Sequence, residues 1–280
     1  MRIGSESFLQ RVRKHLDSLP VTERQLADFV LEFPGELASY AGNELAQLAG
    51  VSPSTVSRFI RRIGYANYED ARKQVREDKQ SGSPLFQSAS QALRASNLVA
   101  THLERSISNL NSTFERLNDK QMLEIVKAII AARQVLVFGS RSSQAFARYL
   151  RWQLIQVVPN VLCIPGPGET LAEYLASMSE RDCLVIFGTR RQTRQMDALL
   201  QHAAPKGVKI LYISDQTSAD FPQATWSLQC DCYGPGLLDN HVAVMALCDL
   251  LSTMVIEAAG TAGRKRLAAI EQAHEDTGEL

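Results

Sequence analysis

The spacing of apolar residues changes about midway along the chain. In the first eighty residues apolar positions recur three or four residues apart, which is typical of helices with one buried face. After about residue 134, short runs of consecutive apolar residues alternate with stretches of helical spacing. Such alternation is typical of a parallel sheet with helices on both faces. The pattern predicts an all-α domain followed by an α/β domain.

The predicted elements of the second part follow one another in regular order. Nearly continuous apolar runs predict strands at residues 135–138, 161–164, 183–187, 208–213 and, more weakly, 225–230. Helical spacing separates the first four runs, at residues 144–156, 170–178 and 193–204. Two further helical patterns come before the first strand, at residues 92–117 and 120–132. The order predicts successive strand, helix, strand units.

Residues 43–64 have the pattern of a short helix, a tight turn at Gly50 and Val51, and a second helix with two distinct faces. Ser52 and Pro53 predict the start of that second helix, because serine caps free amide groups and proline lacks the amide that would be unused there. Apolar residues at positions 56, 59, 60 and 63 form one stripe. Together these features predict a helix-turn-helix.

The polar face of the second helix predicts contact with DNA. Hydroxyls and guanidinium groups reach base edges and phosphates when a helix lies in the major groove. The residues expected to contact a double-stranded operator are Ser52, Ser54, Thr55, Ser57, Arg58, Arg61 and Arg62. The alternative is an ordinary surface helix with solvated arginines. The joint occurrence of turn, cap, apolar stripe and basic face favours DNA binding.

Charge and cysteine content narrow the class of protein. Thirty basic and thirty acidic side chains cancel, so DNA affinity must come from local patches.

The amino terminus has no apolar core of a secretion signal, and we expect no later stretch long and uncharged enough to span a bilayer. We therefore expect a cytoplasmic protein. Five cysteines lack paired metal-ligand spacing, so reduced thiols, no metal and no cofactor are expected. A redox or metal role for Cys230 and Cys232 is the alternative.

A polar segment rich in glycine, serine and proline predicts the boundary between domains. Residues 79–90 have the composition of a linker. We therefore expect a helix-turn-helix domain at residues 1–78 and an effector-binding and oligomerisation domain at residues 91–280. No catalytic residue is assigned.

Polar loops follow the first and third predicted strands, where ligands gather in parallel sheets. The first loop contains Ser140, Arg141, Ser142 and Ser143, and the second contains Thr189, Arg190, Arg191 and Thr193. Hydroxyls and arginines converging on one crevice suit a phosphate or carboxylate. These eight residues are the expected effector site. Alternatively, Ser142 and Thr193 only cap helices, and the arginines form ion pairs or cover a subunit interface.

The phrase LAGVSPSTVSRFIRRIGY, followed by a linker and a parallel α/β domain, resembles the RpiR-type bacterial transcriptional regulators. The resemblance covers nearly the whole chain. It implies a DNA-binding domain and a flavodoxin-like sugar isomerase (SIS) domain that senses phosphosugars. It further implies a homodimer or homotetramer and, for function, repression.

The third-strand loop departs from that family pattern. Family members usually carry Ser-x-Ser-Gly-x-Thr there, whereas residues 188–193 read Gly-Thr-Arg-Arg-Gln-Thr. Losing the glycine restricts close backbone approach to an anion, and the arginines offer side-chain contacts instead. The effector is therefore expected to be a sugar phosphate or another anionic metabolite. The alternatives are an isomerase using Glu169, Glu173 or His241, and a DNA-binding protein whose α/β half only oligomerises.

Overall fold

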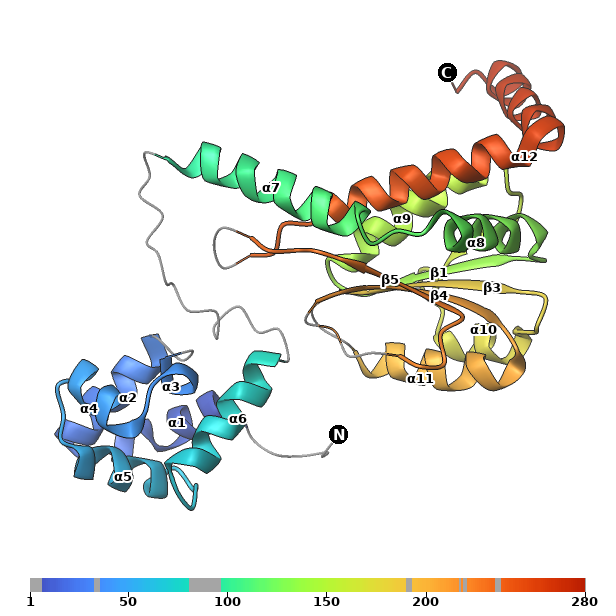
Figure 1. Ribbon diagram of the computed structural model, residues 1–280. Helices are drawn as coiled ribbons and strands as arrows, with labels where there is room; N and C mark the ends of the chain where they lie inside the picture. The colour runs from blue at the N-terminus through green and yellow to red at the C-terminus, as the bar shows by residue number, and fades with distance from the viewer. Residues whose placement is uncertain are drawn as a thin grey trace. The chain divides into compact units, whose positions relative to one another are not determined.

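The structure, a computed structural model, describes residues 7–32, 36–80, 97–189, 193–216, 218, 221–234 and 238–279. Contacts divide the chain into two compact units, one helical and one α/β (Figure 1). The predicted linker lies almost wholly outside the described residues. The last helix of the first unit reaches Gln80, two residues beyond the expected end of that domain. The domain limits remain a prediction.

The helical unit buries one face of each main helix. Its described elements are α1 (Phe8–His15), η1 (Leu16–Ser18), α2 (Val21–Glu32), α3 (Glu36–Ser39), α4 (Gly42–Leu48), α5 (Pro53–Arg62) and α6 (Tyr68–Gln80). The stripe expected on the second helix of the motif is buried, with Phe59 and Ile60 at 0% exposure. These side chains pack into one core with Phe8, Leu26 and Leu45. The predicted amphipathic helix is confirmed.

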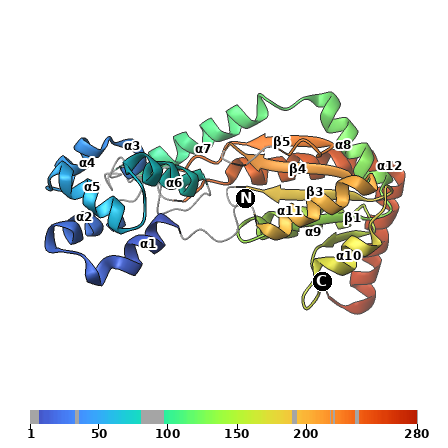
Figure 2. The same ribbon diagram turned by 90° about the horizontal axis from the view of Figure 1, so that it is seen from below.

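The α/β unit is built on a parallel sheet. Its strands are β1 (Val135–Gly139), β2 (Val161–Cys163), β3 (Cys183–Gly188), β4 (Lys209–Asp215) and β5 (Trp226–Cys230). They lie in the order β2-β1-β3-β4-β5, and all neighbours are parallel. Figure 2 shows β5, β4, β3 and β1 side by side. Each predicted strand is confirmed to within two residues at either end.

Helices cover both faces of this sheet (Figure 1). On one face lie α8 (Asp119–Ala131), α9 (Ser143–Ile155) and the first part of α12 (Val242–Thr277). On the other face lie α10 (Leu171–Ser177) and α11 (Arg194–Ala203), followed by η4 (Ala204–Lys206). Alternate residues of β1 point to the two cores, Val135 and Val137 to the first and Leu136 and Phe138 to the second. The double cover explains the continuous apolar strands.

Polar contacts hold α7 (Leu98–Phe114) against the segment after β5. The Asn109 side-chain amide donates to the Tyr233 carbonyl at 2.9 Å. The Thr113 hydroxyl accepts from the Asp231 N–H at 2.8 Å. Both side chains are fully buried. Arg116, just beyond the helix, pairs with the Asp231 carboxylate at 2.8 Å.

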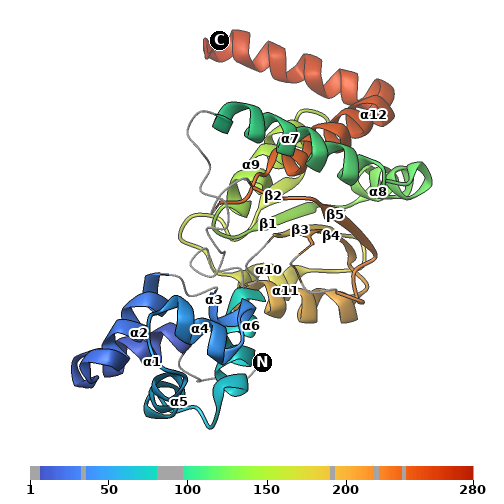
Figure 3. The same cartoon turned by 60° about the vertical axis from the view of Figure 1, so that its left-hand side comes forward.

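The sequence pattern did not predict α12, and the expectation about apolar stretches was wrong on this point. Among the described residues, α12 is long and apolar enough to cross a membrane by length and composition. Its buried residues, including Val244, Leu247 and Leu251, pack into the sheet core instead. A non-helical residue, Gly260 (φ 53°, ψ −132°), bends it, as Figure 3 shows. A core helix passes the same compositional test.

Candidate functional site

The turn between α4 and α5 is built as the sequence predicts. Gly50 adopts a φ of 66°, a conformation that glycine accepts without strain. The Ser52 hydroxyl accepts a hydrogen bond from the Thr55 N–H at 3.2 Å, and Pro53 is the first helical residue. The α5 helix ends just before Gly64, which has a φ of 91°. The expected start and end of the second helix are both confirmed.

The exposed side of α5 carries Ser54, Ser57, Arg58 and Arg61, which we call the reading face. The Ser57 hydroxyl donates to the Pro53 carbonyl at 3.3 Å, and an Arg58 guanidinium N–H donates to the Thr55 hydroxyl at 3.3 Å. Among the described residues, the Arg61 side chain has no hydrogen-bond or ion-pair partner. The reading face therefore presents two guanidinium groups that no described carboxylate neutralises.

Two further residues expected to contact DNA make contacts within the domain. Thr55 is 3% exposed, and its hydroxyl is bonded to Ser52 at 2.9 Å. Arg62 grips the Glu23 carboxylate of α2, with 2.7 Å between Nε and Oε2, and this hydrogen bond raises the pKa of Arg62. Spacings of four and three residues put Thr55, Phe59 and Arg62 on one side of the helix. Both polar residues therefore contribute to packing within the domain, and their contact with DNA stays a prediction.

A residue that the pattern did not single out fixes the end of α5. The Arg11 guanidinium lies over the Tyr65 ring, 4.7 Å from its centroid, and donates to the Gly64 carbonyl at 3.1 Å. This contact joins α1 to the end of the motif. Sequence spacing carries no signal for it, because the two parts are more than fifty residues apart.

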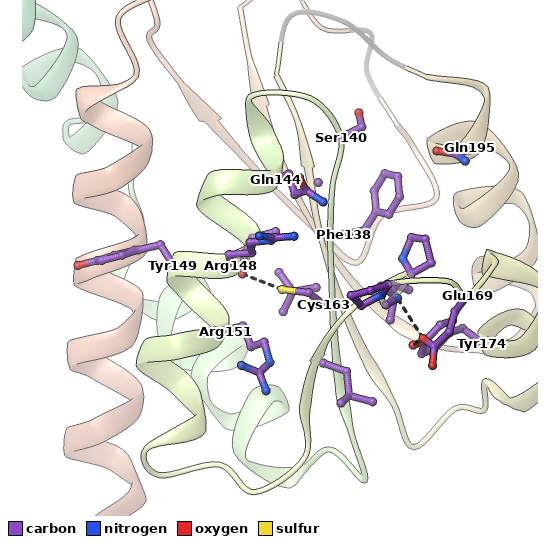
Figure 4. A pocket seen from close by; sticks show the side chains of 18 of the residues that line it. Phe138, Ser140, Gln144, Arg148, Tyr149, Arg151, Cys163, Glu169, Tyr174 and Gln195 are labelled. Carbon is purple, nitrogen blue, oxygen red and sulfur yellow. Dashed lines mark hydrogen bonds between the residues drawn. The ribbon is translucent and has the colours of Figure 1, made fainter. Parts of the chain in front are cut away.

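A cleft of about 1100 Å³ opens at the carboxyl ends of β1 and β2 (Figure 4). One wall is the face of α9 that carries Gln144, Arg148 and Arg151. The opposite wall comes from the loop after β2 and from α10, with Glu169 and Tyr174. The strand order reverses direction between β1 and β3, beside this cleft. Ligands of doubly wound sheets bind at such a place.

Of the residues expected to bind the effector, Ser140 and Arg141 line the cleft. Ser142 is exposed, occupies the N-cap position of α9 and makes no side-chain cap there. Thr193 caps α11, its hydroxyl accepting from the Met196 N–H at 3.4 Å. Arg190 and Arg191 lie outside the described residues.

Ser143 and Thr189 are buried and hydrogen-bonded to each other. Their hydroxyl oxygens are 2.8 Å apart, and the residues are only 3% and 5% exposed. The expected convergence of the two loops is therefore present at this pair. Since each hydroxyl is bonded to the other and neither lines the cleft, the pair joins the start of α9 to the end of β3, and its contact with an effector stays a prediction.

Arg141 has a φ of 55°, which is uncommon for a residue with a side chain. The conformation costs about 1–2 kcal/mol for a non-glycine residue. Among the described residues, Arg141 is the one non-glycine residue that has a positive φ. Strain of this kind concentrates at functional sites.

Sequence reasoning missed the arginines of α9. Gln144, Arg148 and Arg151 are spaced by four and three residues, so they share one helix face, and that face lines the cleft. The Arg151 Nε donates to the Val161 carbonyl at 3.2 Å, which fixes the position of its guanidinium. No ion pair involves these arginines within the described part of the chain. The helical spacing of these three residues carries the signal that would have predicted this wall.

The facing wall offers hydrogen-bond acceptors. The Glu169 carboxylate accepts from the Gly166 N–H at 3.0 Å and from the Tyr174 hydroxyl, and the latter bond raises the pKa of Tyr174. Glu173 caps the start of α10 with Thr170, whose hydroxyl lowers the pKa of that carboxyl. His241 packs against Phe146, with ring centroids 5.1 Å apart, and does not line the cleft.

Cys163 lies on the floor of the cleft and is half-buried, whereas the other four cysteines are buried. Its thiol donates to the Ala147 carbonyl at 3.3 Å. Burial raises the pKa of the Cys163 thiol, and the nearby charges of Arg151 and Arg148 oppose that shift. Both guanidinium groups therefore act on the floor of the cleft.

Comparison with known proteins agrees with this division of the chain. Residues 6–82 match the helix-turn-helix domain of the rpiR family, and residues 128–229 match the SIS domain. An uncharacterized HTH-type transcriptional regulator from Providencia stuartii is 26% identical over 221 residues, covering 76% of each chain. The HTH-type transcriptional regulator HexR of Pseudomonas aeruginosa is 24% identical over 265 residues, covering 89% of each chain.

Solved structures share the fold. The sugar isomerase domain of an RpiR transcription factor from Sphaerobacter thermophilus has a TM-score of 0.58 and 24% identity, covering 63% of this chain and 99% of that domain. The Vibrio vulnificus NanR protein complexed with ManNAc-6P has a TM-score of 0.57 and 17% identity, covering 97% of this chain and 99% of its own. The chain thus combines the helix-turn-helix domain of the rpiR family at residues 6–82 with a SIS domain at residues 128–229.

Proposed function

We propose that the reading face of α5 binds operator DNA and that an anionic metabolite, bound in the cleft, controls this binding. DNA binding is proposed because Arg58 and Arg61 are exposed on a helix whose other side is buried in the core. Guanidinium groups on an otherwise solvated helix face suit phosphates and guanine edges. Effector binding is proposed because three arginines line one cleft and none of them has a described carboxylate partner.

The DNA contacts are tested with fragments that the wild-type protein selects from a random pool. Arg58→Ala and Arg61→Ala should each weaken binding by roughly tenfold or more where the arginine reads a base. A phosphate contact should instead lower the salt dependence by about one unit of slope. Arg24→Ala, which removes an exposed arginine of α2, is the matched control. Unchanged affinity and salt slope in both α5 variants would remove the assigned reading face.

A sugar phosphate is the effector class that the site supports best. The NanR structure holds ManNAc-6P on the same fold. The cleft of this chain adds Ser140 and Arg141 at the end of β1, as the sequence predicts for an anion. A ligand at about 100 times its dissociation constant should stabilise the protein by roughly 2.7 kcal/mol. If no small anion raises the melting temperature, the α/β unit only oligomerises.

Repression by a homo-oligomer completes the proposal. Exposed apolar residues along α7, namely Val99, Leu103 and Ile107 at 85%, 59% and 48% exposure, support self-association. A dimer would present two reading faces to a pseudo-palindromic operator. The effector would change their spacing and release the DNA. Sedimentation of the full chain and gel shifts with added effector test these points.

We assign no enzymatic activity to the cleft. Sugar isomerisation needs a base beside the carbon acid. Glu169 lies on the cleft but is hydrogen-bonded to Tyr174, Glu173 caps a helix, and His241 lies away from the cleft. Incubating the protein with a panel of phosphosugars tests this assignment. Isomerisation that disappears in Glu169→Gln would overturn it.

A further inference from the structure

One arginine of α5 is held by a buried carboxylate of α2. The Arg62 guanidinium donates to both oxygens of Glu23, from Nε at 2.7 Å and from a terminal nitrogen at 3.4 Å. The Glu23 side chain is 3% exposed, whereas that of Arg62 is 44% exposed. Glu23 therefore lies inside the helical unit, and its charge is balanced there by an arginine that remains partly exposed.

The other two arginines of α5 are not neutralised in this way. Arg58 donates to the Thr55 hydroxyl, which carries no charge, at 3.3 Å. The Arg61 side chain has no partner in the described part of the chain. Both arginines therefore keep their full charge on the reading face. The charge of Arg62, by contrast, is compensated by a carboxylate.

Arg62 lies at the edge of the reading face. With about 3.6 residues per helical turn, position 62 is about a quarter turn around α5 from the centre of that face, on the side of Arg58. When a helix lies in the major groove, its central side chains face the base edges and its flanks face the sugar-phosphate walls. A guanidinium released from Glu23 would therefore face a wall of phosphates.

We expect the pair to persist when α5 binds DNA. Separating it would leave an unbalanced carboxylate inside the protein, and this costs several times as much as one exposed ion pair returns. A second contact fixes α2 to the turn of the motif, since the Gln25 side-chain amide donates to the Ala49 carbonyl at 3.0 Å. Removing only the charge of Glu23 should therefore release Arg62 without displacing α5.

We infer that Glu23 limits sequence-independent binding of DNA by holding Arg62 away from the phosphates. The inference rests on the proposed function of the reading face. Glu23 acts through Arg62 and is therefore a positioning residue. An additional phosphate contact would strengthen binding to every duplex and carry no sequence information. With Arg62 held, affinity depends more on the side chains that read bases.

Glu23→Gln tests the inference, because the amide keeps the shape of the side chain and removes its charge. Fluorescence anisotropy with a duplex of random sequence should show tighter binding than for the wild type and a salt slope larger by about 0.9. The affinity should accordingly fall by an additional factor of about 3.5 between about 50 and 200 mM salt. A merely structural role of Glu23 would weaken binding and leave the salt slope unchanged.

Two further variants separate the released arginine from a general change of charge. Asp28→Asn removes one negative charge from an exposed position of the same helix and should leave the salt slope at the wild-type value. The double variant Glu23→Gln/Arg62→Gln removes both members of the pair and should return the slope to that value. If Glu23→Gln does not fold, Glu23→Met repeats the test with an uncharged side chain of similar volume.

The outcomes separate the role of Glu23 from the proposed function. A wild-type salt slope in Glu23→Gln would overturn the inference. A double variant with a slope about 0.9 below the wild-type value would also overturn it, since Arg62 would then contact a phosphate while paired. If Arg58→Ala and Arg61→Ala weaken binding while the Glu23→Gln slope is unchanged, only the role of Glu23 fails. If neither arginine variant changes binding, the reading face fails as well.

Discussion

At the scale of residues, Arg141 combines a strained backbone with a place on the cleft. Arg141→Gly should relieve about 1–2 kcal/mol of strain, offset by about 0.5–1 kcal/mol from the greater freedom of glycine in the unfolded chain. We expect the stability to change by less than about 1 kcal/mol while phosphate-ester binding weakens. Urea denaturation and calorimetry measure the two effects.

Arg141→Asn is the matched control, because asparagine accepts the same conformation without the positive charge. It should weaken binding as much as the glycine variant. A stability loss above about 2 kcal/mol in either variant would show that the arginine serves the fold.

The buried carboxylate of Asp182 predicts an acid-dependent loss of stability. Burial alone would raise the pKa of Asp182, but hydrogen bonds from Arg133 at 2.7 and 2.8 Å and from the Ser179 N–H at 2.8 Å outweigh it. The pKa is therefore lowered from its ordinary 3.8. A lowered folded-state pKa gives stability that is present above about pH 3.8 and lost as the pH falls through the folded value.

We therefore expect Asp182→Asn to lower the melting temperature at pH 7, with the difference from wild type shrinking below about pH 4. Thermal melts between pH 7 and pH 3 check this. Asp249→Asn, which changes an exposed aspartate of α12, should shift nothing. A difference that stays constant across the range would contradict the assigned ion pair.

Residue assignments from the sequence succeeded where one helix face could be read, and failed where the partner was distant. Ser52 as a cap and Phe59 as core follow from spacing alone. The burial of Thr55 also follows from spacing, since it lies four residues before Phe59, yet its hydroxyl suggested DNA contact. The ion pair of Arg62 with Glu23, 39 residues away, was not predicted. No local pattern encodes that contact.

At the scale of elements, the junction of β1 and α9 leaves no room for a side chain at Gly139. A Cβ atom there would lie 2.2 Å from the Ser143 carbonyl oxygen. Gly139→Ala should therefore push α9 away from β1, costing about 1–3 kcal/mol of stability and weakening anion binding. Thermal melts and calorimetry measure both effects.

Gly42→Ala is the control for this change. Its added Cβ would meet only the Tyr68 ring, at 3.6 Å, which is an ordinary contact. It should leave the stability nearly unchanged. A Gly139→Ala protein with wild-type stability and affinity would show that the junction can relax, and the argument from close packing would fail.

The strands of the α/β unit were predictable because each is an apolar run bounded by polar turns. The α12 helix was not, since apolar residues occur on several of its faces and no narrow stripe marks it. The cleft lies at the carboxyl ends of β1 and β2, whereas the sequence placed it at the ends of the first and third strands. Its α9 wall was not predicted, because Arg148 and Arg151 belong to a helix face and not to the polar loops at the strand ends.

At the scale of the whole molecule, each unit has its own hydrophobic core. The core around Phe59 shares no residue with the cores of the sheet. Phe59→Ala should cost about 3–5 kcal/mol in the helical unit and abolish DNA binding. The α/β unit should keep its ligand-dependent thermal shift, because its packing is unchanged.

Leu211→Ala provides the reciprocal change, since Leu211 is buried in the core of the sheet. It should lower the melting temperature of the α/β unit and reduce the ligand-dependent shift. A single melting transition that both variants lower equally would contradict independent cores.

The polar seam along α7 restricts how that helix can move. Asn109 and Thr113 are fully buried and satisfied by backbone groups of Tyr233 and Asp231. Sliding the helix by part of a turn would strand these groups without partners, at about 1–3 kcal/mol each. Apolar contacts tolerate gradual sliding, whereas these hydrogen bonds form only at one position of α7 along the segment after β5. Any displacement of α7 would therefore be a jump between discrete positions in which its buried polar groups are hydrogen-bonded.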